Sequence, residues 1–159
     1  MLALAFGLLA AASAHAQSKI GFVSSERVLR EAVPAVKAQK KLEKEFEKRD
    51  QDLQRMAKQL QSMQESLEKN GVTMGDADRK ANEREYADLN REFQRRQREF
   101  REDLNQRRNE ELAGVLERAN KAIREIAETE KYDAILQDAI YINPRVDLTD
   151  RVIKALADK

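Results

Sequence analysis

Hydrophobic residues recur through the middle of the chain at steps that alternate between four and three residues. Over residues 34–69 this spacing predicts a helix with the a/d seam of a left-handed coiled coil. The seam consists of Leu42, Phe46, Arg49, Leu53, Met56, Leu60, Met63 and Leu67. A return helix is predicted over residues 77–130, with an inner stripe at Tyr86, Leu89, Phe93, Phe100, Leu104, Leu112, Val115, Ala119, Ile123 and Ile126. The two helices form a hairpin that turns near residues 70–76, where Gly71 suits a left-handed helix end.

Strand-like segments flank this hairpin. Lys19–Ser24 and Tyr132–Ile142 carry apolar residues in extended patterns, and Asn143-Pro144 marks a turn after the second segment. A hairpin that goes out and comes back brings these two segments together, so we expect them to pair in a sheet.

Short helices are predicted beside each strand. Ser24 is a candidate N-cap for a helix over residues 25–32, and Pro34 separates that helix from the long one. Residues 147–158 predict an amphipathic helix that covers one side of the strands. The fold class is therefore α+β, mainly α.

The predicted elements divide the chain into a body and an arm. The body comprises residues 17–33 and 131–159, and the arm comprises residues 34–130. The first arm helix reaches about 54 Å at 1.5 Å per residue. The return helix is longer by a turn or more, and we expect its surplus to pack near the first strand and short helix. Because a body this small is marginal alone and exposes strand edges, we expect an oligomer whose sheets join across chains.

Charge patterning supports long solvated helices. Charged residues make up 37% of the chain, yet the formal net charge is only +1. Such interspersed opposite charges are typical of exposed helical surfaces, whereas a nucleic-acid binder needs uncompensated Lys and Arg. Disorder is the competing interpretation of this polarity, and the apolar periodicity argues against it.

The first 16 residues predict a secretory signal peptide. They are small and apolar and end in Ala14-His15-Ala16, which places cleavage near Ala16/Gln17. No Lys or Arg precedes the apolar core, so an uncleaved anchor and an apolar tail stay as alternatives. The chain has no cysteine, and its single histidine lies in this segment. A cleaved chain therefore lacks the usual zinc ligands and the Ser-His and Cys-His nucleophile pairs, which argues against an enzyme.

Five short segments make the chain resemble the Skp/OmpH family of periplasmic chaperones over essentially its whole mature length. These segments are Lys19-Ile-Gly-Phe-Val23, Leu53-Gln-Arg-Met56, Arg108-Asn-Glu-Glu-Leu112, Tyr132-Asp-Ala-Ile-Leu136 and Asp147-Leu-Thr-Asp-Arg-Val-Ile-Lys-Ala-Leu156. The resemblance implies a homotrimer with a small β-barrel-like trimerisation body and α-helical tentacles around a cavity. Family members hold unfolded outer-membrane proteins without ATP or another cofactor, and this sequence has no GxxxxGK[ST] loop.

The resemblance also implies contact with lipopolysaccharide through basic tentacle residues. Arg96, Arg107 and Arg108 occupy comparable places, although the register of the last two is shifted by one residue. An alternative function from a different class is a structural coiled-coil spacer or scaffold of the cell envelope. The short turn at residues 71–76 offers such a scaffold little surface for binding a partner.

Three sets of candidate site residues follow. Apolar residues that contact a client, or else form the hairpin core, are Phe46, Met56, Met63, Phe93 and Phe100. Basic residues that contact a client or lipid, or else lie on a solvated helix face, are Arg49, Arg96, Arg107 and Arg108. Residues of the body that join chains are Ile20, Phe22, Val23, Ile135, Leu136, Ile140 and Ile142. Polar residues in the seam are also expected to weaken helix pairing locally and let the arm bend.

Overall fold

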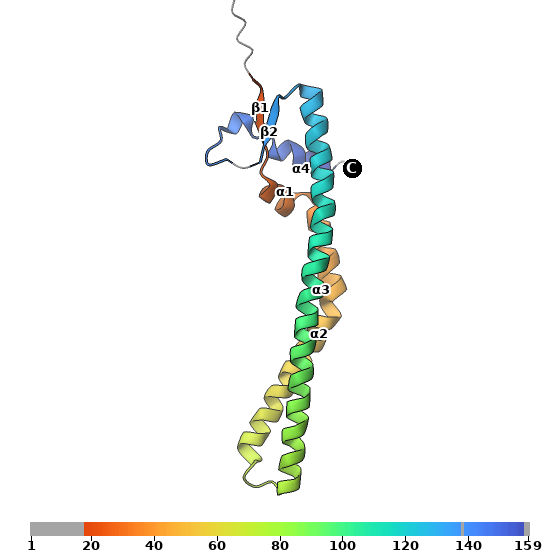
Figure 1. The fold of residues 1–159 in the computed structure, drawn as a ribbon, viewed down its shortest axis with the longest axis vertical. Helices are drawn as coiled ribbons and strands as arrows, with labels where there is room; N and C mark the ends of the chain where they lie inside the picture. Colours follow the sequence, from red (N-terminus) through yellow and green to blue (C-terminus); the bar gives the residue numbers. More distant parts are fainter. Residues whose placement is uncertain (1–17, 138, 158–159) are drawn as a thin grey trace, which may run out of the picture.

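A computed structural model describes residues 18–137 and 139–157 as a long helical hairpin attached to a small group of short elements (Figure 1). The predicted signal peptide and its cleavage position lie outside these residues. The elements follow in the order β1 (Ile20–Phe22), α1 (Ser25–Glu31), α2 (Val33–Asn70), α3 (Asp76–Glu130), β2 (Ala134–Leu136), η1 (Pro144–Val146) and α4 (Thr149–Ala157). The mainly helical fold class with its long hairpin is confirmed.

The start of each N-terminal helix follows from its first residues. The Ser24 side chain accepts a hydrogen bond from the backbone N–H of Arg27, at 3.3 Å, and caps α1 as predicted. Ala32 then adopts an extended conformation, and Pro34 occupies the first turn of α2, where its missing N–H removes no helical bond.

The strands are parallel because the return helix overshoots the base of the hairpin. α3 has 55 residues against 38 in α2, and the surplus corresponds to about 25 Å of helix. Figure 1 shows α3 running past the start of α2 to the far side of the body. The chain reverses after Lys131, which is left-handed at φ 56°, so that β2 enters the sheet in the same direction as β1. In this sheet Ile20 pairs with Ala134 and Phe22 with Leu136.

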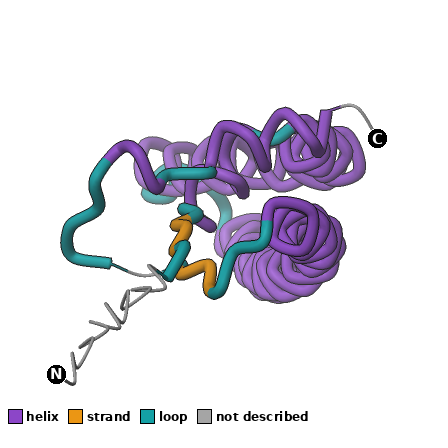
Figure 2. The backbone as a smooth tube through the Cα atoms, turned by 90° about the horizontal axis from the view of Figure 1, so that it is seen from above, coloured by secondary structure: helices purple, strands orange, loops and turns teal. Residues whose placement is uncertain are grey.

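The core lies where the surplus of α3 meets the body. Small residues on α3 pack against the start of α2, α1 and α4, and the sheet lies beside these helices when the molecule is seen from above (Figure 2). The buried cluster consists of Val23, Val28, Ala32, Ala35, Ala38, Val115, Ala119, Ala122, Leu148, Val152 and Leu156. It draws on both the predicted body and the predicted arm, so packing ties the two together.

Strand β2 is shorter than predicted. It ends at Leu136, whereas the sequence suggested an extended segment as far as Ile142. The reason is that β1, its pairing strand, ends here. The carbonyl of Leu136 accepts a hydrogen bond from the N–H of Val23, and two residues after Val23 the chain enters α1. Ile140 and Ile142 therefore lie in the connection to η1, and Ile140 is fully exposed.

The hairpin turn also differs from the prediction. Gly71 is right-handed, at φ −58°, and the N–H groups of Thr73 and Met74 both bond the carbonyl of Asn70 at 2.9 Å. Glycine is needed here for close approach, because a Cβ would lie 2.3 Å from the carbonyl oxygen of Leu67. Gly75 occupies the N-cap position of α3 and makes no side-chain capping bond.

We expect substitution of Gly21 to destabilise the body. A Cβ on Gly21 would lie 2.5 Å from Cδ1 of the buried Leu148 and 3.3 Å from the Tyr132 ring, so overpacking should cost about 1–3 kcal/mol in Gly21→Ala. Gly114→Ala is the matched control, because nothing lies within 4 Å of its Cβ position in α3. Helix propensity favours Ala there by about 1 kcal/mol. Urea unfolding should therefore give opposite signs for the two variants, and equal effects would contradict the packing argument.

Candidate functional site

The arm is held together by a narrow apolar seam. Phe46 and Leu60 are buried at 6% and 8% exposure, whereas most other predicted seam residues are half-buried. Four of the five apolar candidates, Met56, Met63, Phe93 and Phe100, belong to this half-buried group. They lie at the predicted seam spacing and keep part of their surface in solvent. The geometry is compatible with both roles given to them, packing and contact with another chain.

Arg49 sits in a cluster that joins the two helices. Phe46 on α2 and Phe100 on α3 meet edge to face, with ring centroids 5.5 Å apart. The Arg49 guanidinium lies 5.5 Å from the first centroid and 5.7 Å from the second. Its Nη1 donates to Oδ2 of Asp103 at 2.7 Å. This polar seam residue is therefore bound across the hairpin, where the sequence alone suggested a simple interruption.

Arg107 belongs to a second ionic cluster between the helices, nearer the body. Its Nε donates to Glu45 on α2 at 3.0 Å and its Nη2 to Glu111 at 2.8 Å, and it also pairs with Glu110. Lys41 adds a bond from α2 to Glu111 at 2.6 Å. Hydrogen bonds from Lys41 and Arg107 hold the pKa of Glu111 below its usual 4.5, and those from Gln106 and Arg107 do the same for the pKa of Glu110.

The other two basic candidates differ from Arg49 and Arg107. Arg96 donates to Glu92 on its own helix at 2.6 Å, so it adds a local pair on α3. Arg108 is exposed and makes no ion pair with a described residue. Three of the four arginines are thus engaged within the chain, and Arg108 is the one with its guanidinium open to a ligand.

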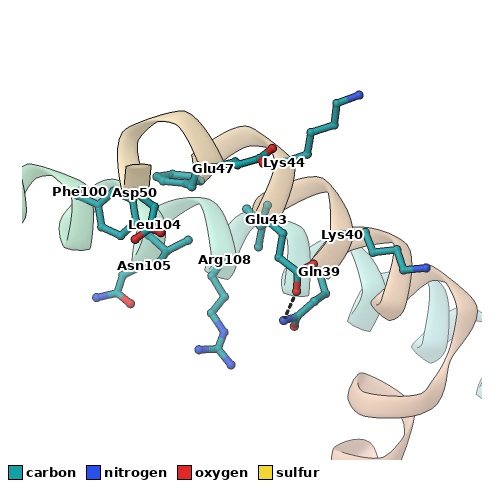
Figure 3. A pocket seen from close by; sticks show the side chains of 12 residues that line it. Gln39, Lys40, Glu43, Lys44, Glu47, Asp50, Phe100, Leu104, Asn105 and Arg108 are labelled. Atoms are coloured by element: carbon teal, nitrogen blue, oxygen red, sulfur yellow. Dashed lines mark hydrogen bonds between the residues drawn. The ribbon is translucent and has the colours of Figure 1, made fainter. Parts of the chain in front are cut away.

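A hollow of about 710 Å³ lies along the hairpin beside these clusters (Figure 3). Phe46, Phe100, Leu42 and Leu104 supply its apolar lining. Charged and amide side chains from both helices surround it, with Arg108 and Asn105 pointing to the same side in Figure 3. Acidic and basic groups balance around this rim, so the hollow offers apolar surface without a dominant charge.

The sheet presents a second apolar surface on the body. Strand residues alternate between faces, and Gly21, Val23 and Ile135 point toward the core. The opposite face carries Ile20, 45% exposed, and Leu136, 49% exposed, with Phe22 half-buried beside them. On the other side of β1, Phe22 bridges Asp147, whereas the outer edge of β2 has no strand partner among the described residues.

Ionic contacts close the body around the end of α3. Lys19 donates to the carbonyl oxygen of Glu130 at 2.8 Å and lies 4.0 Å from the centroid of the Tyr132 ring. Arg151 on α4 pairs with the Glu130 carboxylate. These contacts tie β1, α3 and α4 together next to the sheet.

Two kinds of site are not found among the described residues. Over residues 18–137 and 139–157 no group of His, Cys, Asp and Glu is arranged to hold a metal ion. Within the same residues, no helix is long and apolar enough to cross a membrane.

Sequence reasoning missed the partners of the seam arginines. Asp103 was not singled out, and Glu45 and Glu111 were not predicted to bond the basic residues of the seam. Glu45 adjoins Phe46, Asp103 adjoins Leu104, and Glu111 adjoins Leu112. Charges that flank seam positions are placed to pair across a coiled coil, and this signal could have found them.

Comparisons with known proteins agree with this geometry. A family model described as outer membrane protein (OmpH-like) matches residues 19–156. The chaperone protein Skp of Yersinia enterocolitica is 31% identical over 97% of this chain and 96% of its own length. Skp of Photorhabdus luminescens is 33% identical over 86% and 84% of the two chains, and Skp of Escherichia coli K12 is 28% identical over 97% and 96%.

A solved structure has the same fold. The crystal structure of an OmpH-like protein from Caulobacter crescentus superposes with a TM-score of 0.72 at 17% identity. The superposition covers 90% of this chain and 86% of that one. This likeness extends over both the hairpin and the short elements.

The Arg107 cluster should make the arm less stable in acid. Because Glu110 and Glu111 have pKa values held below 4.5 in the fold, their stabilisation is complete above that pH and is lost as the pH falls through the lower folded values. Arg107→Gln should lower the melting temperature clearly at pH 7 and much less at pH 3, as followed by circular dichroism. Arg95→Gln is the control, since among the described residues Arg95 pairs with Glu92 and Glu99 of its own helix α3, and it should cost less at pH 7. An Arg107→Gln effect as large at pH 3 as at pH 7 would contradict the ionic origin.

Proposed function

The chain belongs to the OmpH-like outer membrane protein family, and on this premise we propose that it is an ATP-independent holdase chaperone of the periplasm. It binds unfolded outer-membrane proteins in a cavity between arms and prevents their aggregation before membrane insertion. The mechanism is encapsulation without chemistry. Its location in the periplasm rests on the signal peptide predicted over residues 1–16.

The observation that carries the cavity in this proposal is the uncovered apolar face of the sheet, because it calls for further copies of the chain. A two-stranded sheet is marginal in water unless further strands or a packed layer support it. Here the inner face packs on the core, while Ile20 and Leu136 face solvent and the β2 edge is open. Further copies of the chain satisfy both needs, because their sheets can cover the face and pair with the edge.

We propose that the chains assemble as a homotrimer through this surface. Joining bodies places the arms side by side around an enclosed space. Of the predicted contact residues, Ile20, Phe22 and Leu136 lie on the outward face, with Ile140 exposed in the connection that follows. Val23 and Ile135 point inward and support the interface from within the core.

The arm surface suits a client that is held by many contacts, each of which is weak while their sum is tight. Most of its arginines pair with carboxylates of the same chain, as Arg95 does with Glu92 and Glu99. Such pairs are exposed and exchange readily with solvent, so a client competes for them at small cost. Many weak contacts from several arms then give a high overall affinity while each contact stays exchangeable. A client leaves when its strands pair in a membrane barrel.

Contact with lipopolysaccharide is a secondary proposal with narrow support. Of the three arginines that the family resemblance implicates, Arg96 and Arg107 are paired with carboxylates. Arg108 makes no such pair with a described residue and is the most available of them to a lipid phosphate.

We expect Leu136→Glu to dissociate the assembly. The charge would enter the apolar contact between bodies without touching the core of a single chain, since Leu136 is 49% exposed. Light scattering should show a molar mass that falls from that of a trimer to that of a monomer, with helical content retained. Val72→Glu is the control, because Val72 is 95% exposed at the tip of the hairpin and should leave the mass unchanged. A wild-type chain that is monomeric would contradict the assembly itself.

The holdase function is tested by diluting a urea-denatured β-barrel membrane protein with and without the assembled chain. We expect light scattering by the aggregating client to be largely suppressed at one assembly per client, without ATP. The Leu136→Glu monomer should suppress much less, because its arms no longer enclose a space. Unchanged aggregation would contradict the chaperone proposal. Purification with one folded partner in fixed ratio, in place of varied unfolded clients, would favour the scaffold alternative.

A further inference from the structure

Arg49, Phe46, Phe100 and Asp103 form a cluster whose residues line two neighbouring hollows. Phe100 lines both the hollow of about 710 Å³ and a second one of about 300 Å³. Phe46 lines the larger hollow, and Arg49 lines the smaller. The Phe100 ring therefore stands as the partition between them. A rotation of that ring away from Phe46 would join the two hollows into one slot between the helices.

One cation holds the partition in place. The Arg49 guanidinium lies within 6 Å of both ring centroids and is fixed at its far side by Asp103 on the partner helix. A guanidinium at this distance attracts the ring faces. Loss of the Arg49–Asp103 bond frees the guanidinium and, with it, the ring pair.

The Arg49–Asp103 ion pair is weak enough for the two helices to separate locally. The side chains of Arg49 and Asp103 are 42% and 53% exposed, so water and salt compete for both. Exposed ion pairs add little stability, and an edge-to-face ring pair is similarly modest. Such a contact closes the hairpin at rest and yields to a competing ligand.

We propose that Arg49 and Asp103 form a latch that holds the rings of Phe46 and Phe100 against each other and releases them to a client. The occupant of the opened slot is an apolar side chain of an unfolded client, aromatic for preference. Its ring replaces one of the two rings beside Arg49, so the cation keeps its contact. Leu42 and Leu104 continue the apolar lining. Because acidic and basic side chains balance around the rim, the hollow favours neither positively nor negatively charged client side chains. This inference rests on the proposed holdase function and adds a gated contact surface to it.

The first test measures opening in the assembled chain without client. In Arg49→Gln and in Asp103→Asn, amide exchange near Phe46 and Phe100 should be about five- to tenfold faster than in the wild type. Arg55→Gln is the matched control, because it removes the same charge from α2, where Arg55 pairs with Asp52 on its own helix. Exchange that is unchanged in both latch variants, or equally raised in the control, would overturn the latch.

The second test measures access by a client. Benzoylphenylalanine at Leu104, in the larger hollow, should crosslink to a urea-denatured β-barrel membrane protein about fivefold more in the Arg49→Gln background than in the wild-type or Arg55→Gln background. Equal crosslinking in all three, with client aggregation still suppressed, would overturn the gate and leave the holdase function standing. Failure of the wild-type chain to suppress aggregation would overturn the holdase function and the gate together. The exchange measurement separates these cases, since it involves no client.

Discussion

The unequal length of the two arm helices is the constraint on which the rest of the fold depends. With equal helices, the chain would return to the start of α2 and meet β1 from the opposite direction. Because α3 has 55 residues and α2 has 38, the return helix passes the base and supplies a wall for the body. Val115, Ala119 and Ala122 lie on this wall and bury against α1, α2 and α4. The overshoot thus sets the parallel strands, the site of the core and the rigid junction between arm and body.

Small side chains make that junction close. Alanines on both helices, Ala35 and Ala38 on α2 with Ala119 and Ala122 on α3, leave little between the backbones near the base. Farther out the seam changes to Phe46, Phe100 and Leu60, and ionic pairs flank it. The hairpin is therefore densely packed at the body and held by aromatic and charged contacts beyond it. Because the packing is densest near the body, we expect the helices to separate more easily in the outer part of the arm than at its base.

Features that depend on periodicity were predicted correctly from the sequence. Features that depend on a particular contact between distant residues were not. The apolar periodicity and the turn residues between the helices placed both long helices within one residue of their observed ends, and Ser24 and Pro34 located the break before α2. Gly71 was predicted to be left-handed because glycine adopts that conformation readily. In the structure it is right-handed, and glycine is required because a Cβ would clash with the Leu67 carbonyl oxygen. Ile140 was placed in a strand because its neighbours alternate, but a strand also needs a partner, and β1 has none left to offer. Arg49 looked like a gap in the seam because periodicity does not report the pairing with Asp103.

Under the proposed function, the placement of apolar surface explains how the chain can hold aggregation-prone proteins without aggregating itself. A permanently exposed apolar groove along the arm would draw other copies as readily as any client. In this chain the uncovered apolar face of the sheet belongs to the body, where Ile20 and Leu136 form the proposed contact with further copies. On the arm the large rings face one another under a cation, and the surrounding surface is charged and balanced. In the proposed assembly the exposed face of the body is covered, and a client meets the half-buried apolar lining of the arm hollow together with the ring surface that the proposed latch would release. That division lets one short sequence carry both a specific interface and an unspecific one without either interfering with the other.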